Sequence, residues 1–204
     1  MSNKLFIDPL FSFPVMIPEE TFEMDEDTKH FIENLEKQSN ESNFISKSKY
    51  IFDEPRLKKL SNWIMKYLNV YFKEVIKVQD CEIYITQSWA NYTYKTQRHA
   101  RHNHPNSLLS GVFYLQGEGS KLNFYRGSNN EQFALQLNAS EYTILNSGNY
   151  SYDTKENGVI IFPSKLSHDV GVQEIDKLRI SISFNTWARG LVGSDDEADK
   201  LELK

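Results

Sequence analysis

The chain has 204 residues and a formal net charge of -5 at pH 7. This length fits one domain, and the acidic balance, with no long run of Lys and Arg, argues against a general nucleic-acid-binding surface. Cys81 is the only cysteine, which excludes an internal disulfide and a cysteine-based zinc cluster. No segment approaches the roughly 20 apolar residues of a membrane span, and the first residues lack a signal-peptide pattern. We therefore expect a cytoplasmic protein that does not enter the membrane.

The first part of the chain predicts two helices after a proline-rich extended start. Residues 25–38 begin with acidic side chains, and Phe31 and Leu35 lie one turn apart. Residues 54–77 give the stronger prediction, because Pro55 suits a first helical turn and apolar residues repeat at three- and four-residue steps. This apolar stripe, which should pack on a sheet, consists of Leu57, Leu60, Ile64, Leu68, Tyr71, Phe72 and Val75.

After Cys81 the pattern is typical of strands. Short runs rich in β-branched and aromatic residues are separated by Gly, Asn and Ser. We expect strands at 82–94, 108–116, 121–125, 133–137, 141–146, 158–163 and 178–185. This predicts a mainly β fold with flanking α-helices, either a sandwich or a jelly-roll barrel. A single domain over residues 1–192 would have a helical part up to about residue 80, a barrel core at about 81–188, and an acidic mobile tail at 193–204.

Two histidines two positions apart stand in the segment RHNHPNSLLSGVFYL, which covers residues 101–115. On a strand, His102 and His104 would project from the same face, about 6.6 Å apart, and could bind one metal ion. His99 lies an odd number of steps from His102 and would face the other side of a continuous strand. His168 follows the apolar strand at 158–163 and offers a third imidazole from a distant part of the chain. The alternative, that these are polar loop histidines, remains open.

Arg179 begins the segment LRISISFN, in which Arg179, Ser181 and Ser183 alternate with apolar residues. If both faces of this strand are buried, the guanidinium points into the interior and requires a carboxylate partner. The carboxylate of a small molecule would match the planar fork of Arg179. The alternative is an edge-strand arginine paired with a surface glutamate.

The order of these motifs resembles the 2-oxoglutarate/Fe(II)-dependent dioxygenases, in particular the prolyl-4-hydroxylase-like group. A closer similarity is to the "putative 2OG-Fe(II) oxygenase" family of marine bacteria and cyanophages. Its motifs W-x-N, H-x-H-P, LSGV-x-Y and FPS-x-L-x-H match Trp89/Asn91, His102–Pro105, Leu109–Tyr114 and Phe162–His168. The resemblance covers residues 86–186 and implies a double-stranded β-helix, which is a cupin-like jelly roll.

The resemblance also implies roles for individual residues. His102 and His168 would be metal ligands, and Arg179 would bind the distal carboxylate of 2-oxoglutarate with Ser181 and Tyr114. Position 104 departs from the commonest pattern, in which an aspartate completes two histidines and one carboxylate. His104 could complete a three-histidine site, turn away and leave a water, or be replaced by a distant carboxylate such as Asp153. We favour His104 as a ligand because the strand geometry directs it toward His102.

The implied activity is hydroxylation, in which 2-oxoglutarate and O2 become succinate and CO2 at Fe(II), with ascorbate as a further reductant. The substrate is open among prolyl or other peptide residues and small amino acids. Nucleic-acid and membrane partners are not expected, and the sequence leaves open whether the chain forms a homodimer. The source would be phage or marine bacterial, with action in the bacterial cytoplasm. The alternatives are a cupin-like three-histidine metalloprotein without oxoglutarate and a non-catalytic jelly-roll binding module.

Overall fold

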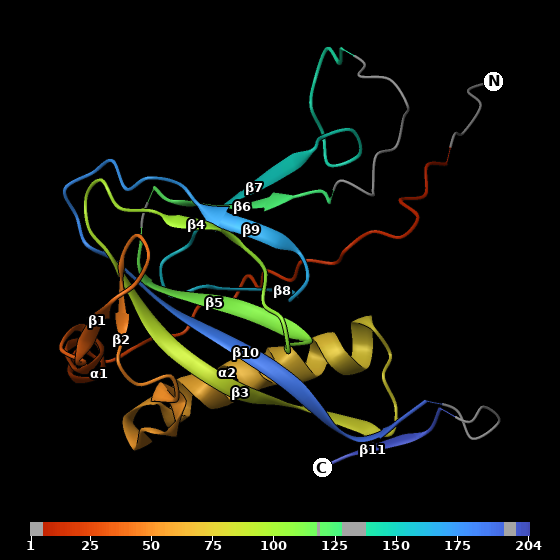
Figure 1. Ribbon diagram of the computed structural model, residues 1–204, viewed down its shortest axis with the longest axis horizontal. Helices are drawn as coiled ribbons and strands as arrows, with labels where there is room; N and C mark the ends of the chain where they lie inside the picture. Colours follow the sequence, from red (N-terminus) through yellow and green to blue (C-terminus); the bar gives the residue numbers. More distant parts are fainter. Residues whose placement is uncertain (1–5, 118, 128–137, 194–198) are drawn as a thin grey trace.

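The computed structural model of the chain describes residues 6–117, 119–127, 138–193 and 199–204. Two antiparallel sheets face each other, and helix α2 covers the outer side of the larger sheet (Figure 1). The larger sheet has the strand order β1-β2-β3-β10-β5-β8, with β11 paired to β10, and the smaller sheet has the order β4-β9-β6-β7. This architecture confirms the predicted jelly roll with flanking helices.

The helices of the described residues are short and lie between Glu26 and Val75. They are α1 (Glu26–Glu33), α2 (Lys58–Val70), the 3-10 turns η1 (Ile51–Asp53) and η2 (Pro55–Leu57), and the π-helical turn η3 (Tyr71–Val75). The strands are β1 (Lys37–Ser39), β2 (Phe44–Ser46), β3 (Cys81–Thr93), β4 (His99–His102), β5 (Leu109–Gln116), β6 (Lys121–Tyr125), β7 (Asn149–Asp153), β8 (Val159–Pro163), β9 (Ser167–Val170), β10 (Arg179–Val192) and β11 (Leu201–Leu203).

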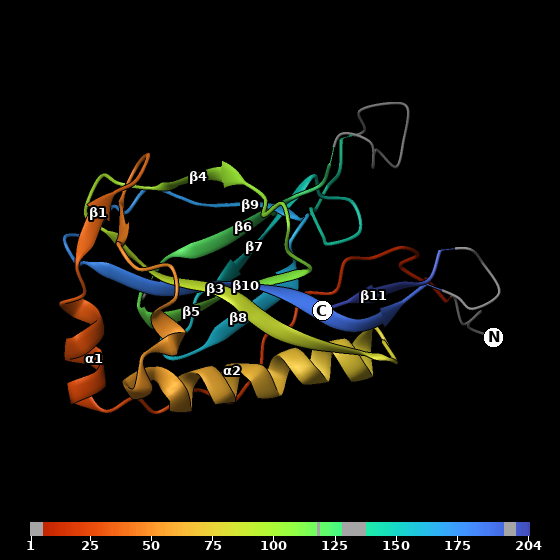
Figure 2. The same cartoon turned by 60° about the horizontal axis from the view of Figure 1, so that its bottom comes forward.

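The apolar stripe of α2 packs on the outer face of the larger sheet, as the sequence predicts. Leu60, Ile64 and Leu68 are fully or almost fully buried and share one core with Ile182 and Phe184 of β10. Figure 2 shows α2 running along the underside of this sheet. Burying each of these side chains contributes about 1.5–3 kcal/mol, so this packing fixes the sheet on which the site is built. The stripe ends before Val75, which is 45% exposed.

Two predicted strands have other outcomes. The segment 133–137 lies outside the described residues. The segment 141–146 is not a strand, and the strand that pairs with β6 is β7 instead. Side-chain hydrogen bonds explain the difference, because Asn146 accepts from the Thr143 amide at 2.7 Å and donates to the Glu141 carbonyl at 2.9 Å. Such local bonds favour a turn over a ladder.

The end of the chain also differs from the sequence pattern. Leu201–Leu203 forms β11 and pairs with Gly190–Val192 of β10, where no strand was predicted. Among the described residues, no helix has the length and apolar character needed to cross a membrane.

Candidate metal and cosubstrate site

The smaller sheet places His102 and His168 side by side. Strands β4 and β9 are antiparallel, and His102 and His168 are direct partners in their register. His104 follows in the loop after β4, where its backbone amide donates to the Ser164 carbonyl at 2.9 Å. The two segments that carry the three histidines are therefore joined by the sheet and by this loop contact.

The three imidazoles converge on one point. One ligand atom from each of His102, His104 and His168 lies within 4.8 Å of the other two. The Nε2 atoms of His104 and His168 are 3.3 Å apart. Among the described residues, no carboxylate belongs to this group of ligand atoms.

Backbone carbonyls set the tautomer of two of these rings. The Nδ1 atoms of His102 and His168 lie 2.8 Å from the Ala100 carbonyl and 2.9 Å from the Leu166 carbonyl. Because a carbonyl only accepts, each Nδ1 carries the hydrogen and each Nε2 is left with a lone pair. Hydrogen bonds of this kind also orient the ligands of metal centres in proteins.

Burial keeps two of these imidazoles neutral. Burial, together with a smaller effect of the neighbouring histidines, lowers the pKa of His104 to about 3 and that of His168 to about 4. Neutral imidazole is the form that binds metal, so no proton has to leave these rings at neutral pH.

A buried hydroxyl network fixes the loops next to the histidines. Ser164 Oγ lies 2.8 Å from the Oγ atoms of both Ser107 and Ser110. Ser110 also donates to Asn185 Oδ1 at 2.8 Å, and the Thr186 amide donates to Ser107 Oγ at 3.1 Å. These bonds tie the His104 loop and the loop before His168 to the central strand β10.

Arg179 lies on the inner face of β10 and is only 4% exposed. Strand β10 runs between β3 and β5, so Arg179 is not on a sheet edge. Among the described residues its guanidinium has no hydrogen bond or ion pair, and Nη1 is buried without a partner. Burial lowers the pKa of Arg179, because holding an unpaired cation away from water disfavours its charged form.

Tyr114 and Ser181 lie beside this guanidinium. Ser181 pairs with Tyr114 across β10 and β5. The Tyr114 hydroxyl is buried, has no hydrogen-bond partner among the described residues, and has its pKa raised by burial, so that it remains a donor. Arg179, Tyr114, Ser181 and the three histidines line one cavity.

His99 also lines this cavity, which corrects the expectation that it faces away from His102. The register of β4 against β9 shifts between His99 and His102, where β4 advances three residues and β9 only two. This bulge turns both side chains to the same face. The H-x-H spacing carries no signal for such a bulge, so sequence reasoning missed this residue.

Asp153 does not reach the histidines. It lies on β7, its side chain is 85% exposed, and it pairs with Lys121 at 3.5 Å. Two further cavity residues were singled out in the sequence: Asn91 in the W-x-N motif, and Ser183 on the strand face of Arg179 and Ser181. The remaining cavity residues, which were not predicted, are Thr93, Val112, Leu122 and Val170. The alternation of Thr93 with Asn91 on one strand could have indicated Thr93.

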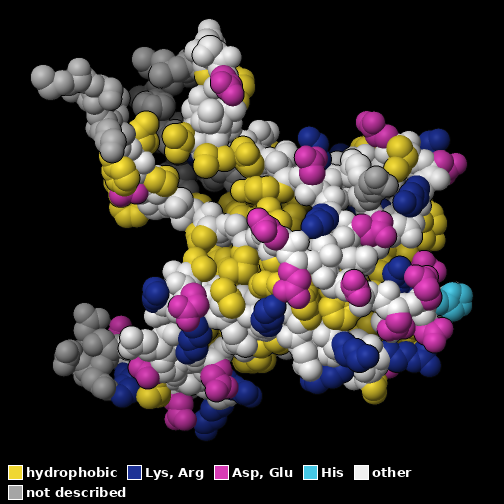
Figure 3. Space-filling model, turned by 180° about the vertical axis from the view of Figure 1, so that it is seen from behind, with side chains coloured by type: hydrophobic (Ala, Val, Ile, Leu, Met, Phe, Trp, Pro, Cys, Tyr) yellow, Lys and Arg dark blue, Asp and Glu magenta, His cyan; other side chains and the backbone are white. Residues whose placement is uncertain are grey.

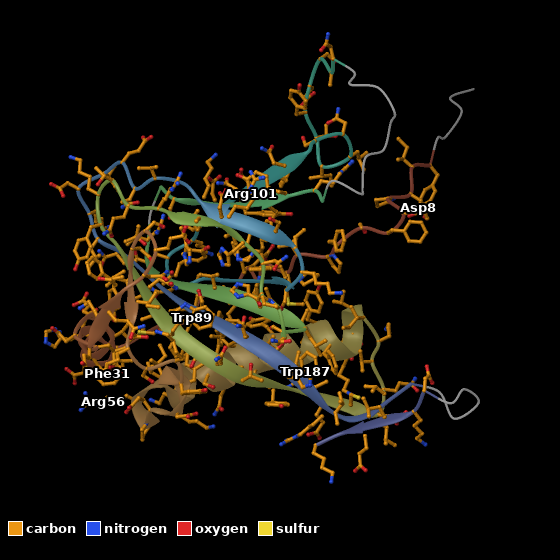
Figure 4. The ribbon with its side chains drawn as sticks, in the orientation of Figure 1. Asp8, Phe31, Arg56, Trp89, Arg101 and Trp187 are labelled. Atoms are coloured by element: carbon orange, nitrogen blue, oxygen red, sulfur yellow. The ribbon has the colours of Figure 1, made fainter. Side chains whose placement is uncertain are left out.

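Trp89 forms the edge of the site near His104. Their ring centroids are 6.0 Å apart, and the Trp89 indole donates to Asn91 at 3.2 Å. Figure 4 shows Trp89 on the larger sheet and Arg101 on the smaller sheet.

Comparisons with known proteins agree with this geometry. Residues 87–185 match the family described as "Putative 2OG-Fe(II) oxygenase". No curated protein matches the chain.

Solved structures share the fold at low sequence identity. HygX from Streptomyces hygroscopicus, with nickel, 2-oxoglutarate and hygromycin B bound, has a TM-score of 0.58 at 11% identity and covers 84% of this chain and 82% of its own. An oxidoreductase of the 2OG-Fe(II) oxygenase family from Burkholderia pseudomallei has a TM-score of 0.54 at 11% identity, covering 78% and 75%. The epimerase SnoN from nogalamycin biosynthesis has a TM-score of 0.55 at 11% identity, covering 84% and 73%. Residues 87–185 thus match a family of 2OG-Fe(II) oxygenases, and the solved structures show that the chain shares the fold of such enzymes.

Proposed function

We propose that His102, His104 and His168 bind Fe(II), that Arg179 binds 2-oxoglutarate, and that the enzyme hydroxylates a small molecule or a peptide side chain. One observation carries this proposal: a buried, unpaired guanidinium shares a cavity with three converging imidazoles. The buried cation of Arg179 requires an anionic partner. Because a metal site lies in the same cavity, that anion would also be able to chelate the metal ion.

The donor set fits a divalent iron. Three imidazoles from β4, its following loop and β9 offer three ligands and leave the remaining positions of an octahedral ion open. Because neutral histidines add no negative charge, the centre would hold +2. A dianionic keto acid would neutralise that charge, so we expect strong cosubstrate binding and weaker binding of the metal alone.

The polar groups around Arg179 fit a carboxylate. Arg179 supplies a planar fork, and Tyr114 and Ser181 supply hydroxyl donors. Both Arg179 Nη1 and the Tyr114 hydroxyl would gain the partner that they lack. Leaving two buried donors unsatisfied costs about 1–3 kcal/mol each, and binding of a dicarboxylate would recover this cost.

When bound, Fe(II) and 2-oxoglutarate would supply the oxidising chemistry: 2-oxoglutarate and O2 become succinate and CO2, and the second oxygen atom converts a C–H group of the substrate to C–OH. The chain's own residues orient and shield this chemistry. The Nδ1 bonds of His102 and His168 fix the ligand rings, and the hydroxyl network of Ser107, Ser110 and Ser164 holds the loops beside them.

The substrate would approach past Trp89, which is half-buried beside His104, because Arg179 and Tyr114 are almost fully buried. The structures of HygX with hygromycin B and of SnoN from nogalamycin biosynthesis support a small molecule as substrate. Basic and acidic side chains are interspersed over the face shown in Figure 3, which gives that face no broad basic patch for nucleic acid. The single cysteine supports action in the cytoplasm.

Anaerobic addition of Fe(II) and 2-oxoglutarate tests this proposal. A visible charge-transfer band should appear only with both, and admission of O2 should produce succinate. His168→Ala should abolish the band, whereas the same change at His30, whose side chain is 80% exposed, should preserve it. Metal binding without any effect of 2-oxoglutarate would refute the proposal and favour a three-histidine metalloprotein of another kind.

A further inference from the structure

His99 is the one cavity-lining histidine that does not belong to the group of converging ligand atoms. The bulge in β4 is what brings it there, since an unbroken strand would direct it to the outer face. A bulge adds an unpaired residue to a strand and commonly re-aims a side chain near a site. The position of His99 therefore indicates a function inside the cavity.

The His99 ring lies flat against His102. The ring centroids are 4.9 Å apart and the planes differ by 20°. The His102 ring in turn lies 4.4 Å from His168, centroid to centroid. His99 thus packs against one ring of the three-histidine group.

The ring nitrogens of His99 have no hydrogen-bond partner among the described residues. An imidazole carries at least one N–H in either tautomer and in either protonation state. The ring is half-buried and lines the cavity, so an acceptor bound there could receive a hydrogen bond from this N–H. Arg179 Nη1 and the Tyr114 hydroxyl lack partners in the same cavity.

We propose that His99 binds the cosubstrate: its face packs on His102 and its free N–H donates a hydrogen bond to a carboxylate of 2-oxoglutarate. This inference rests on the proposed function, because it takes the anion between the histidines and Arg179 to be a keto diacid. A dicarboxylate has enough acceptor lone pairs for His99 in addition to Arg179, Tyr114 and Ser181. His99 is then a positioning residue for the cosubstrate and not a fourth metal ligand.

The two functions of the ring can be separated with two variants. His99→Phe keeps an aromatic face against His102 but removes the N–H. His99→Gln keeps an N–H donor but removes the ring. Ni(II), which does not react with O2 here, allows metal binding and subsequent 2-oxoglutarate binding to be measured separately by calorimetry.

We expect His99→Phe to bind Ni(II) within twofold of the wild type and to bind 2-oxoglutarate about tenfold more weakly. That factor corresponds to one lost hydrogen bond to a charged acceptor, about 1.4 kcal/mol. His99→Gln should retain 2-oxoglutarate binding within about threefold. His30→Phe, on the exposed face of α1, is the matched control and should change neither constant.

Unchanged 2-oxoglutarate binding in His99→Phe would overturn the role of His99 and leave the proposed function intact. Weaker Ni(II) binding in both variants, with normal 2-oxoglutarate binding, would also overturn it, because His99 would then only support His102. A wild-type protein that binds Ni(II) but no 2-oxoglutarate would overturn the proposed function and this inference together. If His99→Phe does not fold, His99→Leu removes the N–H for the same comparison.

Discussion

Replacing Tyr114 with Phe should stabilise the protein without ligand and weaken its binding of 2-oxoglutarate. Tyr114 is 2% exposed, packs with Leu122 and Phe162, and has a hydroxyl without a hydrogen-bond partner among the described residues. The substitution removes one oxygen and leaves the ring in place. It therefore removes a buried unsatisfied donor and little else.

The magnitude follows from the cost of that donor, which is about 1–3 kcal/mol. We expect Tyr114→Phe to raise the free energy of unfolding by about 1 kcal/mol, which for a chain of this size raises Tm by about 2–4 °C. With Ni(II) present, loss of a hydrogen bond to a carboxylate should weaken 2-oxoglutarate binding about tenfold. At saturating 2-oxoglutarate this removes about 1.4 kcal/mol of ligand stabilisation from the variant. The Tm of Tyr114→Phe should then be equal to or lower than that of the wild type, the opposite of their order without 2-oxoglutarate.

Thermal unfolding with Ni(II), with and without 2-oxoglutarate, measures both effects in one experiment. Tyr92→Phe is the matched control, because the buried Tyr92 hydroxyl donates to the Ile32 carbonyl. That variant should lose about 1 kcal/mol of stability and keep its 2-oxoglutarate affinity. If Tyr114→Phe instead lowers Tm and leaves 2-oxoglutarate binding unchanged, the reasoning about the unsatisfied hydroxyl is wrong.

Three further predictions concern the site and the sheet that supports it. His104→Asp should bind Fe(II) more tightly and 2-oxoglutarate less tightly, because it lowers the charge of the centre; unchanged Fe(II) affinity would place position 104 outside the ligand set. Burial lowers the pKa of His104 to about 3 and of His168 to about 4 from 6.5. Between pH 6.5 and about 4 the unfolded chain therefore binds more protons than the folded chain. Metal-free stability, followed by circular dichroism, should therefore fall as the pH falls from 6.5 to about 4, and a flat profile would contradict this. Gly111→Ala should lower stability by about 1–3 kcal/mol in urea unfolding, because its Cβ would lie 2.2 Å from Phe184 Cζ; a neutral effect would show that the ring can move.

The periodicity of side chains along strands predicted much of the site. Alternation placed Arg179 and Ser181 on one face of a strand, and the structure shows them on the inner face of β10. The H-x-H spacing brought His102 and His104 together for the same reason, although His104 lies just beyond the strand. Their roles as ligands stay a prediction.

Local irregularities explain what the sequence did not predict. A bulge between His99 and His102 turns the His99 side chain to the other face of β4, and no pattern of residues in the sequence predicts this bulge. The hydrogen bonds of Thr143 and Asn146 convert an apparent strand into a turn. Both depend on contacts that periodicity does not describe.

X-ray absorption at the iron edge of the Fe(II)-loaded protein tests the central claim most directly. We predict three imidazole ligands at about 2.1 Å, and replacement of two water ligands by two oxygen atoms of chelating 2-oxoglutarate on its addition. His104→Ala should reduce the imidazole count to two. Two imidazoles in the wild type, or no change at the metal on addition of 2-oxoglutarate, would contradict the account.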